Sequence, residues 1–342
     1  MDKVLVTGGA GYIGSHTVLS LLRDGFDVVV IDDLSNSSRE ALTRVEALAK
    51  RKVEFIHASL LDTDKLSATF CEHKFDSVIH FAGLKAVGES IKKPLEYYYT
   101  NLVSTLNLCQ CMLKYNVNKL VFSSSATVYG QGASVPYTED LPLGRAASPY
   151  GQTKVMIEQI LQEIVASNTA LQVASLRYFN PIGADVSGQI GEDPLGIPNN
   201  LMPFIAQVAV GKRDKLAIFG GDYPTEDGTC ERDYIHVSDL ANGHIKALKW
   251  LGEQHHSLYE AFNLGTGIPY SVLGIVKAFI EHTGVDINFE IGKRRDGDLA
   301  SFWADSSKAQ SVLGWQCKYT LADMMKDTWR WQSNNPQGFL SK

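Results

Sequence analysis

Short apolar, β-branched runs alternate with amphipathic helical patterns through the first 180 residues. The runs are continuously apolar, which is typical of strands buried on both faces of a sheet. Strands separated by helices form a parallel sheet, and right-handed crossovers then predict a doubly wound α/β fold. The predicted strands lie near 4–7, 27–31, 53–57, 78–81 and 119–123, and the clearest predicted helices lie near 12–23 and 38–50.

The pattern changes after residue 180, where Pro and Gly repeatedly interrupt the chain up to residue 203. Such breakers indicate long irregular segments. A helix and a strand within 233–264 are expected to rejoin the first sheet. At roughly 150 residues per domain, a chain of 342 residues predicts two lobes. We predict a first lobe of 1–180 plus about 232–264, and a smaller α/β lobe of 181–231 plus about 265–342.

Composition excludes several classes of protein. The formal net charge of -6 disfavours binding to nucleic acid or to an anionic membrane. The strand pattern begins at Lys3, so no secretory leader is expected, and no apolar run approaches the ~20 residues of a membrane helix. Five cysteines without C-x-x-C or H-x-x-x-H spacing predict buried thiols and no metal site. We therefore expect a cytoplasmic protein.

A glycine-rich loop joins the first predicted strand to the first predicted helix. Gly8, Gly11 and Gly14 fit G-x-x-G-x-x-G. Glycines permit a tight turn and a close backbone approach, and the helix N-terminus offers free N–H groups to a pyrophosphate. The loop predicts a dinucleotide site of the Rossmann type, with a plain glycine turn as the alternative.

Asp32 follows the second predicted strand, where an acidic residue meets the adenosine ribose in such folds. A carboxylate there accepts from both ribose hydroxyls and repels a 2′-phosphate, which favours NAD over NADP. Arg39 and Arg44 stand against this preference, because an arginine nearby accommodates that phosphate. The alternative for Asp32 is a helix N-cap or turn residue.

A Y-x-x-x-K pattern follows in S-P-Y-G-Q-T-K. Ser148 and Pro149 are typical of a helix start, so Tyr150 and Lys154 are expected one turn apart on one face. The ammonium and a cationic nicotinamide ring would lower the tyrosine pKa and make Tyr150 a base. Ser125, at the end of a strand, is placed to bond the sugar oxygen and relay the proton. An amphipathic surface helix and a turn serine are the alternatives.

Several longer motifs resemble a known family. They are T-G-G-A-G-Y-I-G-S-H, H-F-A-G-L-K-A-V-G-E-S, F-S-S-S-A-T-V-Y-G, R-Y-F-N-P-I-G-A and the second-lobe segment L-A-I-F-G-G-D-Y-P-T-E-D-G-T-C-E-R-D-Y-I-H-V. The chain resembles the extended short-chain dehydrogenase/reductases, and within them the nucleotide-sugar 4-epimerases. The resemblance covers essentially the whole chain.

The resemblance implies roles residue by residue. Tyr150 would be the base, Lys154 its electrostatic partner and Ser125 the hydroxyl relay. The residues implied for NAD are Gly8, Gly11, Tyr12, Ile13, Gly14, Asp32, Asp33, Asn36, Ser59, Leu60, Phe81, Ala82, Gly83, Lys85, Thr100, Ser125, Tyr150, Lys154 and Phe179. The residues implied for the nucleotide-sugar are Lys85, Ser125, Tyr150, Tyr178, Asn180, Asn200, Leu201, Ala217, Phe219, Arg232, Arg295, Asp298 and Phe302.

Three positions depart from the family pattern. Ser59 stands where the family typically places Asp near the adenine, and Thr100 where Asn is common. Both put the adenine-side contacts in doubt. Phe302 occupies a sugar-pocket position that smaller residues hold in relatives accepting N-acetylated sugars. We therefore expect a preference for the unacetylated hexose.

The activity implied by the resemblance is the interconversion of UDP-galactose and UDP-glucose, with a role in galactose metabolism. NAD, tightly bound and recycled in each turnover, would oxidise C4, and the 4-keto sugar would rotate and be reduced on its other face. A homodimer formed by helices of the first lobe is also implied. A nucleotide-sugar 4,6-dehydratase would need an Asp-Glu pair where Ala126 and Thr127 stand, and a dinucleotide-sensing regulator would not need Tyr150.

Overall fold

A computed structural model describes residues 2–130, 134–167, 170–295 and 298–340. Its central sheet has seven parallel strands in the order β10-β6-β5-β4-β1-β2-β3. The predicted doubly wound α/β fold is confirmed. The strands are β1 (Lys3–Thr7), β2 (Asp27–Asp32), β3 (Glu54–His57), β4 (Ser77–His80), β5 (Lys119–Ser123), β6 (Gln172–Tyr178) and β10 (Leu258–Leu264).

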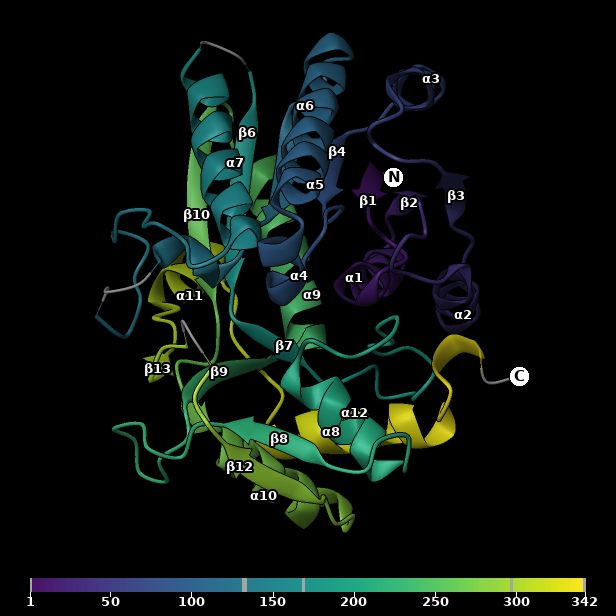
Figure 1. Ribbon diagram of the computed structural model, residues 1–342. Helices are drawn as coiled ribbons and strands as arrows, with labels where there is room; N and C mark the ends of the chain where they lie inside the picture. The colour runs from purple at the N-terminus through teal and green to yellow at the C-terminus, as the bar shows by residue number, and fades with distance from the viewer. Residues whose placement is uncertain (1, 131–133, 168–169, 296–297, 341–342) are drawn as a thin grey trace.

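Helices cover both faces of this sheet (Figure 1). Alternate residues of β1 point to opposite faces, so Val4 and Val6 join one core cluster and Leu5 joins the other. The first face carries α1 (Tyr12–Arg23), α2 (Arg39–Ala49) and α9 (Val237–Gly252). The second face carries α3 (Thr63–Glu72), α6 (Ser104–Lys114) and α7 (Pro149–Ala166). Short elements between them are α4 (Val87–Lys92), α5 (Pro94–Tyr98), the π-helical turn η1 (Tyr99–Val103) and the 3₁₀ turn η2 (Ala126–Tyr129).

The second lobe has two small sheets. β9 (Glu231–His236) pairs with three short strands, and a separate pair of strands lies at the outer end. Apolar residues of α8, α10 and α12 form its core. The remaining elements are β7 (Asn180–Ile182), α8 (Leu201–Ala209), β8 (Leu216–Phe219), β11 (Pro269–Ser271), α10 (Val272–Thr283), β12 (Phe289–Gly292), β13 (Ser301–Phe302), α11 (Ser307–Leu313), α12 (Leu321–Asn334) and η3 (Gly338–Leu340).

The pairing of β9 corrects the boundary predicted near residue 232. α9 and β10 do rejoin the first lobe, but β9 pairs only with second-lobe strands because Asn180, Pro181 and Ile182 lie opposite its residues 234–236. The first-lobe segment therefore begins near Val237. All five thiols are free within the described residues, and Cys109, Cys111 and Cys230 are buried. Cys71 is exposed, contrary to the expectation of buried thiols.

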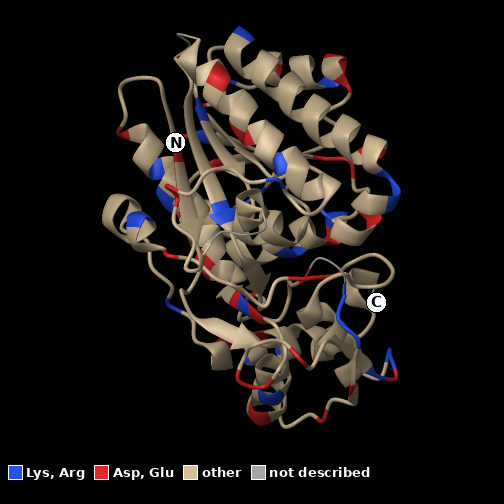
Figure 2. Ribbon diagram, turned by 60° about the vertical axis from the view of Figure 1, so that its left-hand side comes forward, with Lys and Arg blue, Asp and Glu red and all other residues tan. Residues whose placement is uncertain are grey.

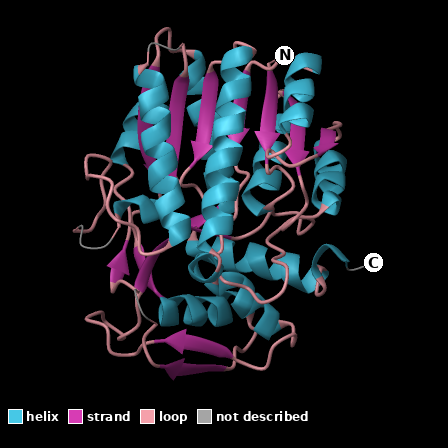
Figure 3. Cartoon of the chain, turned by 45° about the horizontal axis from the view of Figure 1, so that its top comes forward, coloured by secondary structure: helices cyan, strands magenta, loops and turns pink. Residues whose placement is uncertain are grey.

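The carboxyl ends of the seven strands face the second lobe (Figure 3). β2, which follows β1 in the chain, lies on one side of β1 in the sheet, and β4 lies on the other side. Crevices at such a reversal of strand order are the usual ligand sites of open α/β sheets. The glycine loop after β1, Ser125 after β5 and Tyr150 at the start of α7 all lie at this end.

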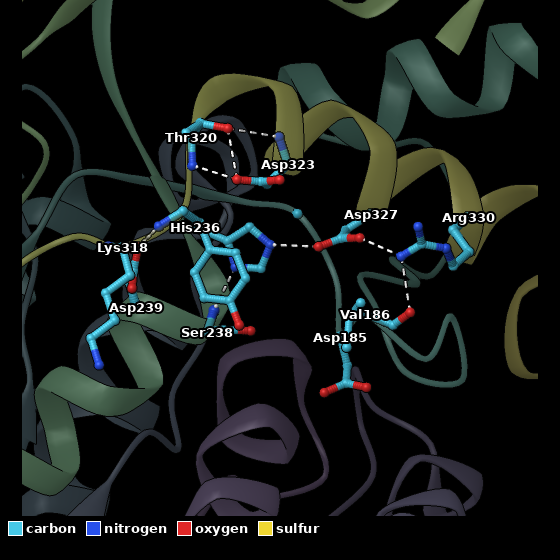
Figure 4. A network of polar contacts seen from close by, with 12 residues as sticks. Asp185, Val186, His236, Ser238, Asp239, Lys318, Thr320, Asp323, Asp327 and Arg330 are labelled. Carbon is cyan, nitrogen blue, oxygen red and sulfur yellow. Dashed lines mark hydrogen bonds and ion pairs between the residues drawn. The ribbon is translucent and has the colours of Figure 1, made fainter. Parts of the chain in front are cut away.

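A network of polar contacts ties α12 to α9 and β9 (Figure 4). Asp239 accepts from the backbone N–H groups of Lys318 and Tyr319 at 3.0 and 3.1 Å. His236 Nε2 lies 3.4 Å from Asp327. The second lobe therefore packs directly against the end of the sheet that carries the loops.

Lys, Arg, Asp and Glu are interspersed over both lobes (Figure 2). Among the described residues, no helix combines the length and apolarity needed to cross a bilayer.

Candidate active site

The glycine loop has the geometry of a phosphate cradle. Gly8 has φ +69°, and a Cβ on it would lie 2.7 Å from the backbone N of Ala82. A Cβ on Gly14 would lie 2.3 Å from Gly8 O, so helix α1 and the loop touch through backbone alone. The N-cap of α1 is Gly11, which has no side chain to cap the first N–H groups. These groups remain available to an anion, so the loop fits the pyrophosphate of NAD.

Asp32 fixes the far side of this loop. Its Oδ2 accepts from Ala10 N at 2.9 Å, and its Oδ1 accepts from Leu34 N at 2.9 Å and Ser37 Oγ at 2.8 Å. Burial raises its pKa, although these hydrogen bonds lower it. Ser38 is the N-cap of α2, so Asp32 does not cap this helix. The hydrogen bond from Leu34 N does make Asp32 a turn residue, which was the other alternative for this position.

Arg39 and Arg44, which counted against a preference for NAD over NADP, both contact other residues of the chain. Arg44 donates to Gln189 O and to Asn335, next to α12. The Arg39 guanidinium lies 4.3 Å from the centroid of the Phe55 ring. Arg44 is therefore held next to α12, whereas one guanidinium nitrogen of Arg39 is buried without a hydrogen-bond partner among the described residues.

The structure brings Ser125, Tyr150 and Lys154 together. Ser148 caps α7 by accepting from Gly151 N at 3.2 Å, as predicted, and Pro149 is its first residue. The Lys154 ammonium donates to Ser123 O at 2.8 Å and lies 6.0 Å from the centroid of the Tyr150 ring. The Ser125 side chain lies close enough to Tyr150 to lower its pKa, against the larger effect of burial. Helix α7 and the end of β5 thus place a phenol, an ammonium and a hydroxyl side by side.

The lowering of the Tyr150 pKa was predicted with the nicotinamide ring in place, and without that ring this pKa is raised. Burial raises the pKa of Tyr150, and the nearby Ser125 side chain only partly offsets this. Burial also lowers the pKa of the Lys154 ammonium to about 8, against the opposite effect of Glu158. The sequence shows the pair of residues but not the loss of solvent around them, which decides the direction.

The adenine-side residues make local contacts. Ser59 Oγ accepts from Leu61 N at 3.3 Å, and Leu60 is buried. Asp62 does not replace the missing family Asp, because it caps α3 by accepting from Lys65 N. Asp33 accepts from Ser35 N, and Asn36 is exposed.

Other predicted NAD residues surround the ends of β4 and β6. Phe81 lies 4.7 Å from the His244 ring, and Ala82 N donates to Thr7 Oγ1 at 3.3 Å. Gly83 has φ +154° beside the Asn101 side chain. Asn101 bonds Leu84 N and O and Thr153 Oγ1, while Thr100 lies on the same π-helical turn.

Two predicted NAD contacts take part in packing between the lobes instead. Tyr12 OH donates to Gly183 O at 2.7 Å, so its side chain joins the lobes and only its backbone faces the loop. Lys85 forms an ion pair with Glu192 at 3.5 Å. Ile13 packs against the core beneath the loop. The NAD roles of these residues stay predictions, and the side chain of Tyr12 lies at the lobe junction.

The second-lobe residues gather around Asp298. Arg295 bonds both oxygens of Asp298, at 3.1 and 2.9 Å, and Arg232 lies 3.6 Å from it. The Arg295 guanidinium also lies 5.6 Å from the centroid of the exposed Phe219 ring. Arg232 donates to Leu299 O as well. Both arginines are thus paired with the carboxylate of Asp298. A diphosphate ligand would have to replace this carboxylate.

The remaining second-lobe candidates lie on nearby elements. Asn200 donates to Glu192 at 3.0 Å, and Leu201 begins α8. Asn180 begins β7, and Ala217 lies on β8. Tyr178 OH accepts from Ser123 Oγ at 3.1 Å, at the end of β5.

An aromatic cluster packs beside η2. Phe302 lies 4.9 Å from Phe179 and 5.1 Å, edge to face, from Tyr137. Tyr137 was not among the predicted residues, because nothing in the sequence near 137 indicates that β13 lies beside it. Glu158 was also missed, although it continues the four-residue spacing of Tyr150 and Lys154.

Two other features lie away from Tyr150. A cavity of ≈ 710 Å³ between Trp303, Trp315 and Tyr319 is lined by none of the predicted site residues. Glu54, Glu72 and His73 bring possible metal ligands within 4.8 Å of one another, but both carboxylates are exposed. The sequence spacing gave no sign of this group because its members come from β3 and the end of α3.

Comparisons with known proteins agree with this geometry. Residues 4–265 match the model of the NAD dependent epimerase/dehydratase family. The UDP-glucose 4-epimerase of Erwinia amylovora is 57% identical over 336 residues, which are 98% of this chain and 99% of that protein. The enzyme of the same name from Bacillus subtilis (strain 168) is 55% identical over 338 residues, 99% of each. The crystal structure of UDP-glucose 4-epimerase from Bifidobacterium longum in complex with NAD+ and UDP gives a TM-score of 0.94 at 47% identity, over 98% of this chain and 100% of that one.

Proposed function

The chain belongs to the NAD dependent epimerase/dehydratase family, and from this membership we propose that it interconverts UDP-galactose and UDP-glucose by inversion at C4. It is an isomerase that uses NAD. The observation that carries the assignment is the grouping of Ser125, Tyr150 and Lys154 at the sheet end that also bears the glycine loop. We place the reaction in galactose metabolism.

Tyr150 acts as the base and acid of the reaction. NAD, when bound, supplies the acceptor and donor of hydride. Tyr150 Oη takes the proton of the sugar 4-hydroxyl and later returns it, with Ser125 holding the sugar oxygen. The positive charges of Lys154 and of the nicotinamide favour the phenolate, which burial alone disfavours.

The first lobe holds the cofactor mainly through its backbone. The first N–H groups of α1 would hold the pyrophosphate, and Asp32 would accept from the adenosine ribose. Phe81 and Phe179 would line the nicotinamide end. Electrons balance within each turnover, so NAD need not leave.

The second lobe holds UDP mainly through side chains. Arg232 and Arg295 bind the nucleotide part from either side of Asp298, and Phe219 stacks on the base. Asn180, Asn200 and the start of α8 complete this side. The hexose lies between Tyr150 and the ring of Phe302, without a charged clamp of its own, so that it can turn over. The bulk of Phe302 favours unacetylated hexoses.

Apolar side chains exposed on α4, α5 and α6 support a homodimer. Leu95 is 83% exposed, and Tyr99 on the adjoining η1 is 61% exposed. Val87, Ile91, Leu106 and Leu113 are exposed as well. Exposed apolar surface of this kind is typical of association sites. The free thiols support a reducing, cytoplasmic location.

The experiment is direct. Purified protein is incubated with UDP-galactose, and UDP-glucose is measured with and without added NAD. We expect UDP-glucose and no net reduction of added NAD. Absence of product from folded protein in both conditions would reject the assignment.

A further inference from the structure

Strand β3 and helix α3 meet at the end of the sheet that lies opposite the active site. β3 is an edge strand of the parallel sheet, and α3 follows it in the chain. Glu54 is the first residue of β3, Glu72 is the last residue of α3, and His73 is the C-cap of that helix. The three side chains gather beside the amino end of the strand, whereas Tyr150 lies at the carboxyl ends of the strands.

The imidazole of His73 is fixed and points toward this group. Its side chain is 7% exposed, and its ring lies 5.5 Å from the ring of Phe75, which is buried in the core on this face of the sheet. Nε2 lies 3.1 Å from Glu54 Oε1, yet it has no hydrogen-bond partner among the described residues. A contact of this length fails as a hydrogen bond only through its angle, so Oε1 lies off the direction in which Nε2 would donate.

The positions of the ligand atoms fit a bound metal ion. One atom from each of Glu54, Glu72 and His73 lies within 4.8 Å of the other two. An ion about 2.1 Å from both Nε2 and Glu54 Oε1, the usual length of zinc bonds to such atoms, would subtend an angle of about 95° between them. That position also leaves the oxygen off the Nε2 direction, as the missing hydrogen bond requires. Both glutamates are exposed, so rotation of their side chains can close the remaining distance.

The donor set selects the kind of ion. Imidazole nitrogen suits zinc and other transition metals, whereas magnesium and calcium prefer oxygen ligands alone. Two ionised carboxylates give the group a double negative charge, which a divalent cation neutralises. The carbonyl end of α3 adds partial negative charge beside His73. With three protein ligands, a tetrahedral ion keeps its fourth position for water.

We propose that Glu54, Glu72 and His73 form a binding site for a divalent transition-metal ion, of which zinc fits the donor set best. The ion would join the edge strand β3 to the end of α3, at the opposite end of the sheet from the reacting groups. The site is separate from the proposed epimerase reaction, so either assignment can fail without the other. The competing interpretation is an ordinary ion pair between His73 and Glu54.

The test measures zinc binding by the whole protein after dialysis against a chelator. Zn²⁺ is added in competition with a chromophoric zinc indicator, which reports the dissociation constant. Two variants remove ligands: Glu54→Gln/Glu72→Gln changes only exposed side chains, and His73→Gln removes the imidazole. The matched control is His255→Gln/His256→Gln, which removes two exposed histidines outside the group.

We expect the wild type and the control to bind one Zn²⁺ per chain with equal affinity. Both ligand variants should bind it about a hundredfold more weakly, an effect that even the hydrogen-bond partners of metal ligands reach. The ¹H–¹³C signal of the His73 ring, assigned by its loss in His73→Gln, should shift and saturate at one equivalent of Zn²⁺. Mg²⁺ alone should leave this signal in place.

Two results would overturn the proposal. Wild-type zinc affinity in Glu54→Gln/Glu72→Gln, or a His73 signal that Zn²⁺ leaves in place, would reduce the group to an ion pair. Weaker zinc binding in the His255→Gln/His256→Gln control alone would place the ion on that exposed pair instead. Neither result depends on epimerase turnover, so the proposed function is tested separately.

Discussion

One ion cluster in each lobe can be compared by its exposure. Glu158 and Arg177 in the first lobe are 0% and 4% exposed, whereas the Arg295 side chain beside Asp298 in the second lobe is 60% exposed. Buried charges with fixed partners hold groups in one geometry, while exposed ones are screened by solvent and adjust to a ligand. The first lobe thus keeps the reacting groups rigid, and the second lobe offers arginines that can exchange a carboxylate for a phosphate. A reaction in which a sugar must turn over while its nucleotide stays bound needs both.

The largest effect is expected from Tyr150→Phe. The change removes the Tyr150 hydroxyl from the rigid first-lobe site and leaves α7 and the glycine loop unaltered. Turnover should fall by about 10²–10⁴-fold, the usual contribution of a general base, while bound NAD, measured by absorbance after gel filtration, stays at the wild-type level. Near-normal turnover would remove Tyr150 from the reaction.

Gly14→Ala is expected to act on cofactor binding. Its Cβ would lie 2.3 Å from Gly8 O, and neither backbone can move without opening the loop. NAD affinity should fall by about a hundredfold, as strained packing of this kind predicts, and titration with NAD measures it. Gly252→Ala is the control, because its Cβ meets nothing within 4 Å. Equal NAD affinity in both variants would show that the loop does not hold the cofactor tightly.

Arg295→Ala tests the exposed arginine of the second-lobe ion cluster. Loss of a charge-assisted contact should raise KM for UDP-galactose by about tenfold with little change in kcat. Arg294→Ala is matched to it, because Arg294 bonds Asp222 and lies 4.2 Å from the Tyr223 ring centroid, so its KM should stay near wild type. A change confined to kcat would place Arg295 outside the nucleotide site.

Phe302→Ala is expected to have the smallest effect. Its ring packs edge to face on Tyr137, and removing it enlarges the hexose side of the pocket. In a competition between UDP-galactose and its N-acetylated analogue, the rate ratio should shift by about fivefold toward the analogue, a typical effect for an apolar pocket. An unchanged ratio would mean that another group limits the size of the sugar.

Local sequence patterns were sufficient to predict most strands and helices of the first lobe. The glycine loop, the Ser148 cap and the Tyr150–Lys154 spacing each depend on residues close in sequence, so their geometry follows from one strand-turn-helix unit. Predicted boundaries of the strands and helices up to residue 123 agree with the structure within about a residue, whereas the helix expected within 233–264 begins only at Val237. The position of β9 was predicted wrongly because its partners, β7, β11 and β13, come from distant segments without a periodic pattern.

The site could be predicted only in part for the same reason. Asp298 and Arg295 are neighbours in sequence, but their contact with Arg232 arises from the pairing of β13 with β9. The side chain of Tyr12 was assigned to NAD, yet it crosses to Gly183, which no local pattern indicates.

The amino-acid sequence by itself determined the family, the parallel α/β fold and the residues that can do the chemistry, because these depend on periodicity and short spacings. The tertiary structure decided the charges on those residues and the partners of the arginines. Burial of Tyr150 and Lys154, and the carboxylate of Glu158 beside them, are set by packing of α7 on β5 and β6, and desolvation has no signature in a linear chain.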